Sequence, residues 1–304
     1  MVFLPRGMGN CLMNEEFLVE PAGFNNALEL KYILEKFGFF QGRFIGKFPK
    51  DWKKHIYQNM DKLPDIEQAR IRNLLDRNQD CLVPSGQPFD SAFPWLKNAH
   101  QQIEQQNFEG IVAASANEWN YPTYSEVDHD YLMGGHDIRI LASSNNYTKI
   151  TQRLLQLSPE IVLVDPFLKL YRDGCEQVLN DFLVCAQKGK CRSFVIWARY
   201  DEASLKTKAA YTQMLGESYK PKLKNDVKIT VKLVNDAASS QKMHARLMLS
   251  KLGGFRFDHG FSEFDADRYV DVAIIDRKTH DGYCHWYLDP GSPNDFEIVE
   301  EHVV

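Results

Sequence analysis

Apolar segments alternate with amphipathic segments from residue 137 to residue 233, and no other feature of the sequence restricts the fold as strongly. Continuous apolar runs at 160–165 and 193–197 are typical of strands that are covered on both faces of a sheet. Between and around these runs, residues 147–157 predict an amphipathic helix, and further helices are expected at 177–187 and 202–217. Strands that alternate with helices in this way predict an α/β sandwich.

Strand signals dominate the end of this region. Residues 227–233 alternate between polar and apolar side chains, as an extended strand does. We expect a short strand at 138–141 and mostly antiparallel strands at 246–252, 255–258, 270–275 and 283–288. Together these segments predict an α/β domain with a mixed sheet over residues 136–290, followed by an acidic C-terminal tail at 291–304.

The first part of the chain, residues 1–135, predicts a mainly helical region. Asn25 or Asn26 can cap a helix that runs to Phe37 and stops at Gly38. Further helices are expected after Pro49, after Pro64 and at 95–106, with one strand at 108–114. The glycine-punctuated segment 41–49 predicts a loop, and it lacks the G-x-x-x-x-G-K-[ST] pattern of a phosphate loop. We place the boundary of this region at 131–135.

Composition limits the class of protein. Hydrophobic residues make up 44% of the chain and charged residues 25%, which predicts a folded globular protein. No apolar run approaches the roughly 18 residues of a membrane span. The six cysteines include no C-x-x-C pair, so we expect them to be reduced and mostly buried. These features predict a cytoplasmic protein with no membrane association and no cofactor.

Charge is distributed unevenly along the chain. Basic residues outnumber acidic residues by nearly two to one between Lys149 and Arg256, although the whole chain has a net charge of -5. A basic segment suits a phosphate or polyanion ligand. The acidic remainder argues against a protein that coats DNA non-specifically. Alternatively, lysines such as Lys220 and Lys222 are simply solvated residues on helix surfaces.

The segment Lys242–Phe261 holds the residues that are best suited to chemistry. His244 and Arg246 are two positions apart in an expected strand, so their side chains should point to the same face. A neutral imidazole can attack phosphorus and form a covalent phosphohistidine. A guanidinium beside it would bind the non-bridging oxygens and stabilise their charge in the transition state. This pair predicts metal-independent chemistry on a phosphodiester.

This segment resembles the motif of the phospholipase D superfamily, in which His-x-Lys is followed by Asp and a glycine-bearing strand. His244-Ala245-Arg246 and Gly253-Gly254 match that pattern, and residues 161–167 are similar to the strand that opens such a domain. The resemblance covers about residues 137–288. It implies a phosphodiesterase, most simply a nuclease of bacterial restriction or antiviral modules, with His244 as nucleophile and Arg246 as phosphate clamp.

The chain departs from the family pattern at several positions. Lys251 stands where the family has Asp, Asp258 stands where relatives have glycine, and Arg246 replaces Lys. Such enzymes use two motifs, so that one histidine attacks while the other protonates the leaving group. This chain has one motif, which implies a homodimer or a partner protein. Two functions stay open: a nuclease, and an inactive subunit that acts in nucleic-acid sensing or assembly within a larger complex.

Other residues are candidates for supporting roles around the motif. We expect Lys242, Lys251 and Arg199 to contact phosphate, and Asp165 and His259 to support the histidine. Asp165 closes an apolar run and is a candidate to orient His244, although an Asp before Pro166 also suits a simple turn. The cluster of His280, Cys284 and His285 lacks a fourth ligand at suitable spacing, so we expect no metal site.

Overall fold

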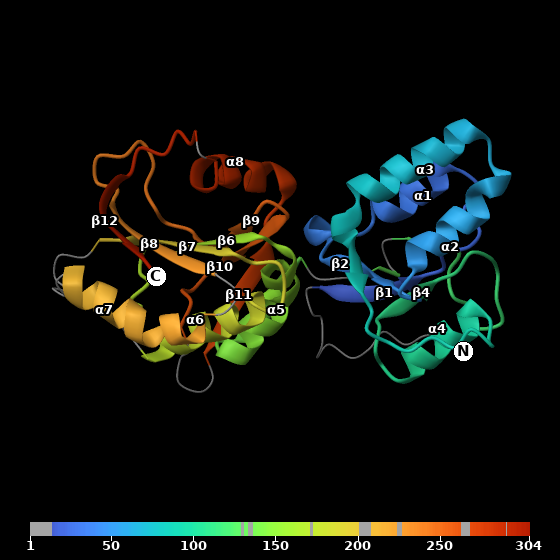
Figure 1. Cartoon of the computed structure of the whole chain (residues 1–304), viewed down its shortest axis with the longest axis horizontal. Coiled ribbons are helices and arrows are strands. Elements are labelled where there is room, and N and C mark those ends of the chain that lie inside the picture. The colour runs from blue at the N-terminus through green and yellow to red at the C-terminus, as the bar shows by residue number, and fades with distance from the viewer. Residues whose placement is uncertain are drawn as a thin grey trace. The chain divides into compact units, whose positions relative to one another are not determined.

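The computed structural model describes residues 14–128, 131–132, 136–170, 173–200, 208–223, 227–262, 268–289 and 291–304, without the side chains of 173, 208–211 and 214. The chain divides into two compact units, residues 1–136 and residues 137–304. Each unit is an α/β arrangement of helices around one sheet (Figure 1).

The first unit contains a four-stranded parallel sheet in the order β3-β2-β1-β4. Its strands are β1 (Glu15–Val19), β2 (Arg43–Lys47), β3 (Leu82–Pro84) and β4 (Gly110–Val112). Its helices are α1 (Ala27–Leu34), α2 (Trp52–Asn59), α3 (Asp65–Arg77) and α4 (Trp95–Glu104). Because its strands run in parallel, helical connections cross over the sheet between them.

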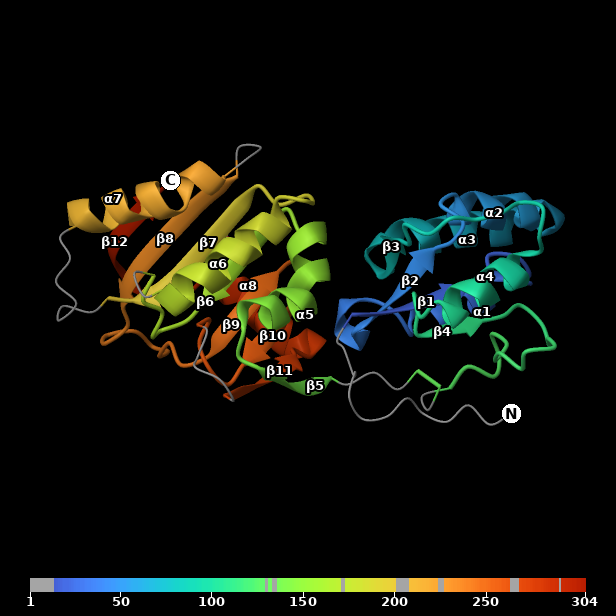
Figure 2. The ribbon, with the colours of Figure 1, turned by 90° about the horizontal axis from the view of Figure 1, so that it is seen from below.

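The two faces of this sheet support separate hydrophobic cores. Helices α1, α2 and α3 cover one face, and α4 covers the other (Figures 1 and 2). Side chains alternate along β1, so Phe17 and Val19 belong to the core under α1–α3, while Leu18 belongs to the core under α4. The sheet is therefore buried on both faces, as parallel sheets are.

Sequence analysis predicted a mainly helical region here and expected only one of the four strands, the one at 108–114 that contains β4. Helix α1 does start as expected, because the side chain of Asn26 accepts a hydrogen bond from the Glu29 amide. The segment 41–49, however, is not only a loop, since it contains the buried strand β2. Position 46 of this strand requires glycine, because a Cβ atom there would come within 2.8 Å of the Phe108 ring.

The second unit is built on an eight-stranded mixed sheet in the order β12-β8-β7-β6-β9-β10-β11-β5. Strands β6, β7 and β8 are parallel to one another, and every other pairing in the sheet is antiparallel. The strands are β5 (Asp137–Leu141), β6 (Glu160–Val164), β7 (Ser193–Arg199), β8 (Lys228–Asn235), β9 (Arg246–Ser250), β10 (Gly253–Phe257), β11 (Tyr269–Ile274) and β12 (Glu297–Val303). The α/β fold class and the mixed sheet are those that the sequence predicts.

Helices cover both faces of the second sheet. Helices α5 (Ser144–Leu157), α6 (Asp173–Ala186) and α7 (Lys208–Ser218) lie on one face, and α8 (Arg277–Tyr287) lies on the other (Figures 1 and 2). The face under α8 packs alternate residues of β6 and β9, among them Val164 and Leu247, against Trp286. Leu163 and Arg246 therefore belong to the opposite face of the sheet.

Two predictions about this unit are wrong. Residues 283–288, expected as a strand, belong mainly to α8, which Asp276 caps by accepting a hydrogen bond from the Thr279 amide. The expected tail at 291–304 contains β12, which pairs antiparallel with β8 and forms one edge of the sheet. The start of the expected helix at 202–217 and most of the expected boundary at 131–135 lie outside the described residues.

Candidate functional site

The candidate site lies at one end of the second sheet. The parallel strands β6, β7 and β8 all end there, and the antiparallel strands place the start of β9 and the end of β10 at the same edge. Ligands of open α/β sheets commonly bind outside the carboxyl ends of parallel strands. The sheet thus gathers most of the sequence-predicted residues from four strand ends: those of β6, β7 and β10 and the start of β9.

Arg246, the first residue of β9, is held by two acidic residues. Its Nη1 atom donates a hydrogen bond to the backbone oxygen of Asp258 at 2.9 Å. Its Nε atom lies 3.8 Å from Oδ1 of Asp165, and this nitrogen is buried without a hydrogen bond among the described residues. The side chain remains 23% exposed. The guanidinium is thus anchored at its base while part of it faces solvent.

Asp165 is the buried partner of Arg246 and not of His244. Its carboxylate accepts hydrogen bonds from the backbone N–H groups of Phe167 at 2.9 Å and Phe261 at 3.3 Å. Burial raises the pKa of Asp165, and these two hydrogen bonds together with Arg246 offset part of that rise. No described contact links Asp165 to His244. The orienting role expected for Asp165 therefore applies to the guanidinium.

A second arginine–carboxylate pair lies at the ends of β7 and β8. Arg199 donates two hydrogen bonds to Asp236, at 3.2 and 2.7 Å, and a third to the backbone oxygen of Met243 at 2.9 Å. Burial tends to raise the pKa of Asp236, but the hydrogen bonds from Arg199 and the Met243 amide outweigh it, so the pKa is lowered. This pair fixes the backbone immediately before His244.

Phe167 lies between the two arginines and was missed by sequence analysis. Its ring is 4.9 Å from the guanidinium carbon of Arg246 and 5.8 Å from that of Arg199. The residue is 59% exposed, although phenylalanine is usually a buried residue. The one signal in the sequence was an aromatic residue directly after the Asp-Pro that ends a strand.

His244 lies outside the strand in which it was predicted. Strand β9 begins at Arg246, and His244 is an exposed residue of the segment before it. None of the described residues forms a hydrogen bond or ion pair with its imidazole. His259 follows β10 at the same edge, and its Nε2 atom is 3.4 Å from Nη2 of Arg268. Two imidazoles thus flank the paired ends of β9 and β10.

The two candidate lysines lie in different places. Lys242 donates hydrogen bonds of 2.6 Å to the backbone oxygens of Asp236 and Ala237, beside the Arg199–Asp236 pair. Lys251 follows the opposite end of β9, which puts it about 16 Å from Arg246 at the usual strand rise. The structure therefore separates Lys251 from the other candidates, and its predicted phosphate contact is wrong for this site.

Helix α8 brings His280 and Cys284 together one helical turn apart. The sulfur of Cys284 lies 3.3 Å from Nε2 of His280, and that nitrogen is 2.8 Å from the Ser250 backbone oxygen. Burial raises the pKa of Cys284 to about 11, so its thiol is protonated at neutral pH. Within the described part of the chain, no group of three or more His, Cys, Asp or Glu side chains could hold a metal ion.

Comparisons with known proteins leave the chain without a family. No protein-family model matches it, and no curated protein matches it. Among solved structures, the archaeal chromatin protein TrmBL2, whose structure is described as showing a novel mode of DNA binding, aligns with 75% of this chain and 82% of its own. That alignment has 11% identity and a TM-score of 0.26, which is too low to carry an argument. No helix among the described residues is long and apolar enough to cross a membrane.

Proposed function

We propose that the second unit is a phospholipase D-like domain that binds single-stranded nucleic acid at the edge formed by Phe167, Arg199 and Arg246. The observation that carries this proposal is the exposed Phe167 ring between two anchored guanidiniums. Proteins that bind single strands combine aromatic rings, on which bases stack, with cations that contact the backbone. The short motif His244-Ala245-Arg246 supports the family assignment.

Anchoring of the arginines suits a binding role. A guanidinium that is already held in place loses less side-chain entropy when it binds phosphate. The Asp165 carboxylate and the backbone oxygen of Asp258 hold Arg246, and the Asp236 carboxylate holds Arg199 in a bidentate pair. The same carboxylates reduce the net positive charge of the edge. We therefore expect moderate affinity in which base stacking contributes as much as charge.

The binding test uses fluorescence anisotropy with labelled single-stranded DNA and RNA. Phe167→Ala should weaken binding about 5- to 150-fold, the equivalent of about 1–3 kcal/mol for one stacked base, and Phe167→Trp should retain it. Phe93→Ala is the matched control, because Phe93 is also an exposed phenylalanine beside a cation, with Lys97 Nζ 4.0 Å from its ring centroid. Equal binding by Phe167→Ala and the wild type would contradict the proposal.

Hydrolysis is the second candidate function, and the exposure of His244 favours it. An accessible imidazole beside a phosphate-binding guanidinium can attack phosphorus. The leaving oxygen then needs a proton, for which His259 at the same edge is the candidate donor. Water must afterwards attack the phosphohistidine, with His259 taking up its proton, to break the N–P bond and restore His244. Cleavage of labelled RNA and DNA should then persist with a chelator present and disappear in both His244→Ala and His259→Ala. Cleavage that survives His244→Ala would eliminate this mechanism and leave the binding role standing.

A further inference from the structure

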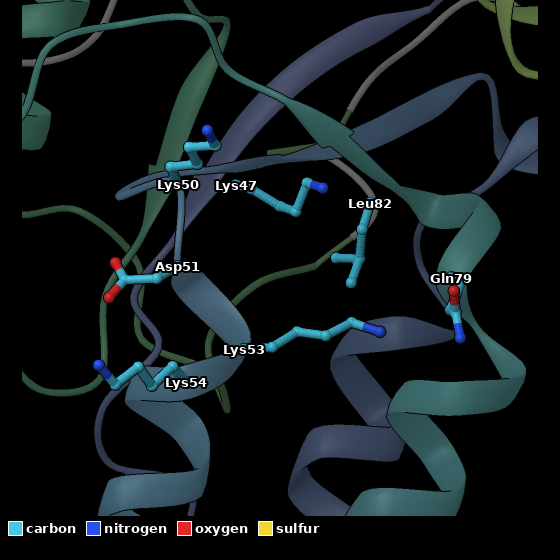
Figure 3. Close-up of a pocket in the computed structure, with 7 residues that line it drawn as sticks. All are labelled: Lys47, Lys50, Asp51, Lys53, Lys54, Gln79 and Leu82. Carbon is cyan, nitrogen blue, oxygen red and sulfur yellow. The ribbon is translucent and has the colours of Figure 1, made fainter.

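The first unit contains a pocket lined by four lysines, and neither the motif nor the proposed function accounts for it. The pocket has a volume of about 260 Å³ and is lined by Lys47, Lys50, Asp51, Lys53, Lys54, Gln79 and Leu82 (Figure 3). We call it the lysine pocket. It lies where β2 ends and α2 begins, beside the segment that leads into β3. Its position is thus at the carboxyl end of a strand in a parallel sheet, where such folds place their ligands.

The lysines reach the pocket from one short stretch of chain. Lys47 is the last residue of β2, and the other three lie in the turn and the first turn of α2 that follow. In Figure 3, the side chains of Lys47 and Lys53 extend toward the same side, with Leu82 between them. Lys53 also donates a hydrogen bond of 3.0 Å to the Leu75 backbone oxygen, which fixes the direction of its ammonium group.

Charge at the pocket is poorly balanced by its own lining. Four lysines line the pocket together with a single carboxylate, Asp51, whose side chain is 52% exposed and lies 3.4 Å from the His55 ring. Asp51 occupies the N-cap position of α2 but makes no side-chain capping hydrogen bond. The partial positive charge at the helix start therefore adds to that of the lysines. The surplus of lysines in the lining therefore favours an anionic ligand.

The size and lining of the pocket restrict the anion. Its volume lies just below the roughly 300–1,000 Å³ of ordinary small-molecule sites, and none of its lining residues is aromatic. A base would find no ring to stack on, whereas a chain of phosphate groups could contact several ammonium groups at once. Lysine ammonium groups are compact point charges that bind phosphate without requiring a fixed orientation. We propose that the lysine pocket binds the polyphosphate chain of a small ligand, such as a di- or triphosphate.

The first experiment measures binding of inorganic tripolyphosphate to the full-length protein by isothermal titration calorimetry. Lys47→Gln/Lys53→Gln should weaken binding at least tenfold, and Lys47→Arg/Lys53→Arg, which keeps both charges, should stay within threefold of the wild type. Lys31→Gln/Lys62→Gln is the matched control, because it removes two exposed lysines from the same unit outside this pocket. Absence of binding to the wild type, or equal weakening in both glutamine variants, would overturn the proposal.

A second set of titrations distinguishes the possible sources of the phosphate chain. ATP and GTP should bind with the same affinity as tripolyphosphate within threefold, because only their phosphates are recognised, and orthophosphate should bind at least tenfold more weakly. Strong preference for one nucleoside triphosphate would overturn recognition by phosphate alone. Arg246→Gln should leave all of these affinities unchanged, so a failure of the nucleic-acid proposal for the second unit would not be confused with a failure of this one.

Discussion

Both units place cations at the carboxyl ends of parallel strands, but they balance the charge differently. In the second unit, Arg199 and Arg246 are each held by a buried carboxylate. In the first unit, the lining of the lysine pocket contains four lysines and one half-exposed carboxylate, Asp51. The second unit contains the basic half of the sequence, whereas the lysine pocket lies in the acidic remainder. Net charge along the chain is therefore a poor guide to where an anion can bind.

The comparison also separates two ways of presenting a cation. An arginine held beside a buried carboxylate presents a fixed group next to an exposed aromatic ring, which suits a nucleic-acid single strand with its stacking bases and regularly spaced phosphates. A cluster of lysines presents compact point charges around a small volume, which suits a compact polyanion. Four predictions follow, from the largest expected effect to the smallest. Three of them test this difference, and the third tests a buried carboxylate of the first unit that no arginine anchor stabilises enough to offset its burial.

Asp165→Ala should destabilise the second unit by about 3–5 kcal/mol, because it leaves the partly buried Arg246 without its carboxylate and two backbone N–H groups without their acceptor. Urea denaturation followed by circular dichroism measures this loss. A loss below about 1 kcal/mol would show that the carboxylate is not the anchor of the site, and the contrast between the two units would disappear.

Gly260→Ala should destabilise the same unit by about 1–3 kcal/mol, the usual range for overpacking a filled site. A Cβ atom at this position would lie 2.5 Å from Oδ2 of Asp165, and the buried carboxylate has little room to move. Gly291→Ala is the matched control, because a Cβ atom there meets nothing within 4 Å. Nucleic-acid binding should weaken together with stability, since Asp165 positions Arg246.

Glu15→Gln should stabilise the first unit by about 1–2 kcal/mol at pH 8 and have little effect at pH 5, a range that allows for partial solvent screening. Burial is the main cause that raises the pKa of Glu15 from 4.5 to about 7, and the negative charge of the nearby Glu109 raises it further. The positive charge of Arg43 offsets part of this rise. Because the folded pKa lies above the unfolded value, ionisation costs stability progressively as the pH rises from about 4.5 to 7. Denaturation curves of the variant and the wild type at both pH values measure the difference in free energy of unfolding. Equal free energies of unfolding at pH 8 would contradict the prediction.

Asp51→Asn should change stability by less than about 0.5 kcal/mol, because this carboxylate is exposed and its contact with His55 is a surface pair. The same substitution should strengthen tripolyphosphate binding about two- to fivefold by removing the one negative charge in the lysine pocket. Calorimetry measures the affinity, and thermal denaturation without ligand measures the stability. A large stability loss would place Asp51 in the same structural role as Asp165 and erase the difference between the units.

Local patterns predicted those elements whose signals lie close together in the chain. The cap at Asn26, the apolar run of β6 and the helical spacing of α5 each lie within a few residues, and each element was expected. Strand β2 was missed because Gly42 and Gly46 suggested a loop, although Gly46 is required by the close packing of Phe108. Helix α8 was missed because its apolar residues are few and clustered at one end.

The sequence by itself determined the α/β class, the mixed sheet and the presence of His244 and Arg246 near one strand. Only the tertiary structure decided what surrounds them, because Asp165 is 81 residues away from Arg246 in the chain and meets it through the pairing of β6 with β9. The tertiary structure also decided the lysine pocket. Its four lysines all lie within residues 47–54, so their grouping is visible in the sequence. The pocket also requires Gln79 and Leu82, which lie near these lysines because β3 pairs with β2. Long-range strand pairing sets both sites, and no local pattern specifies it.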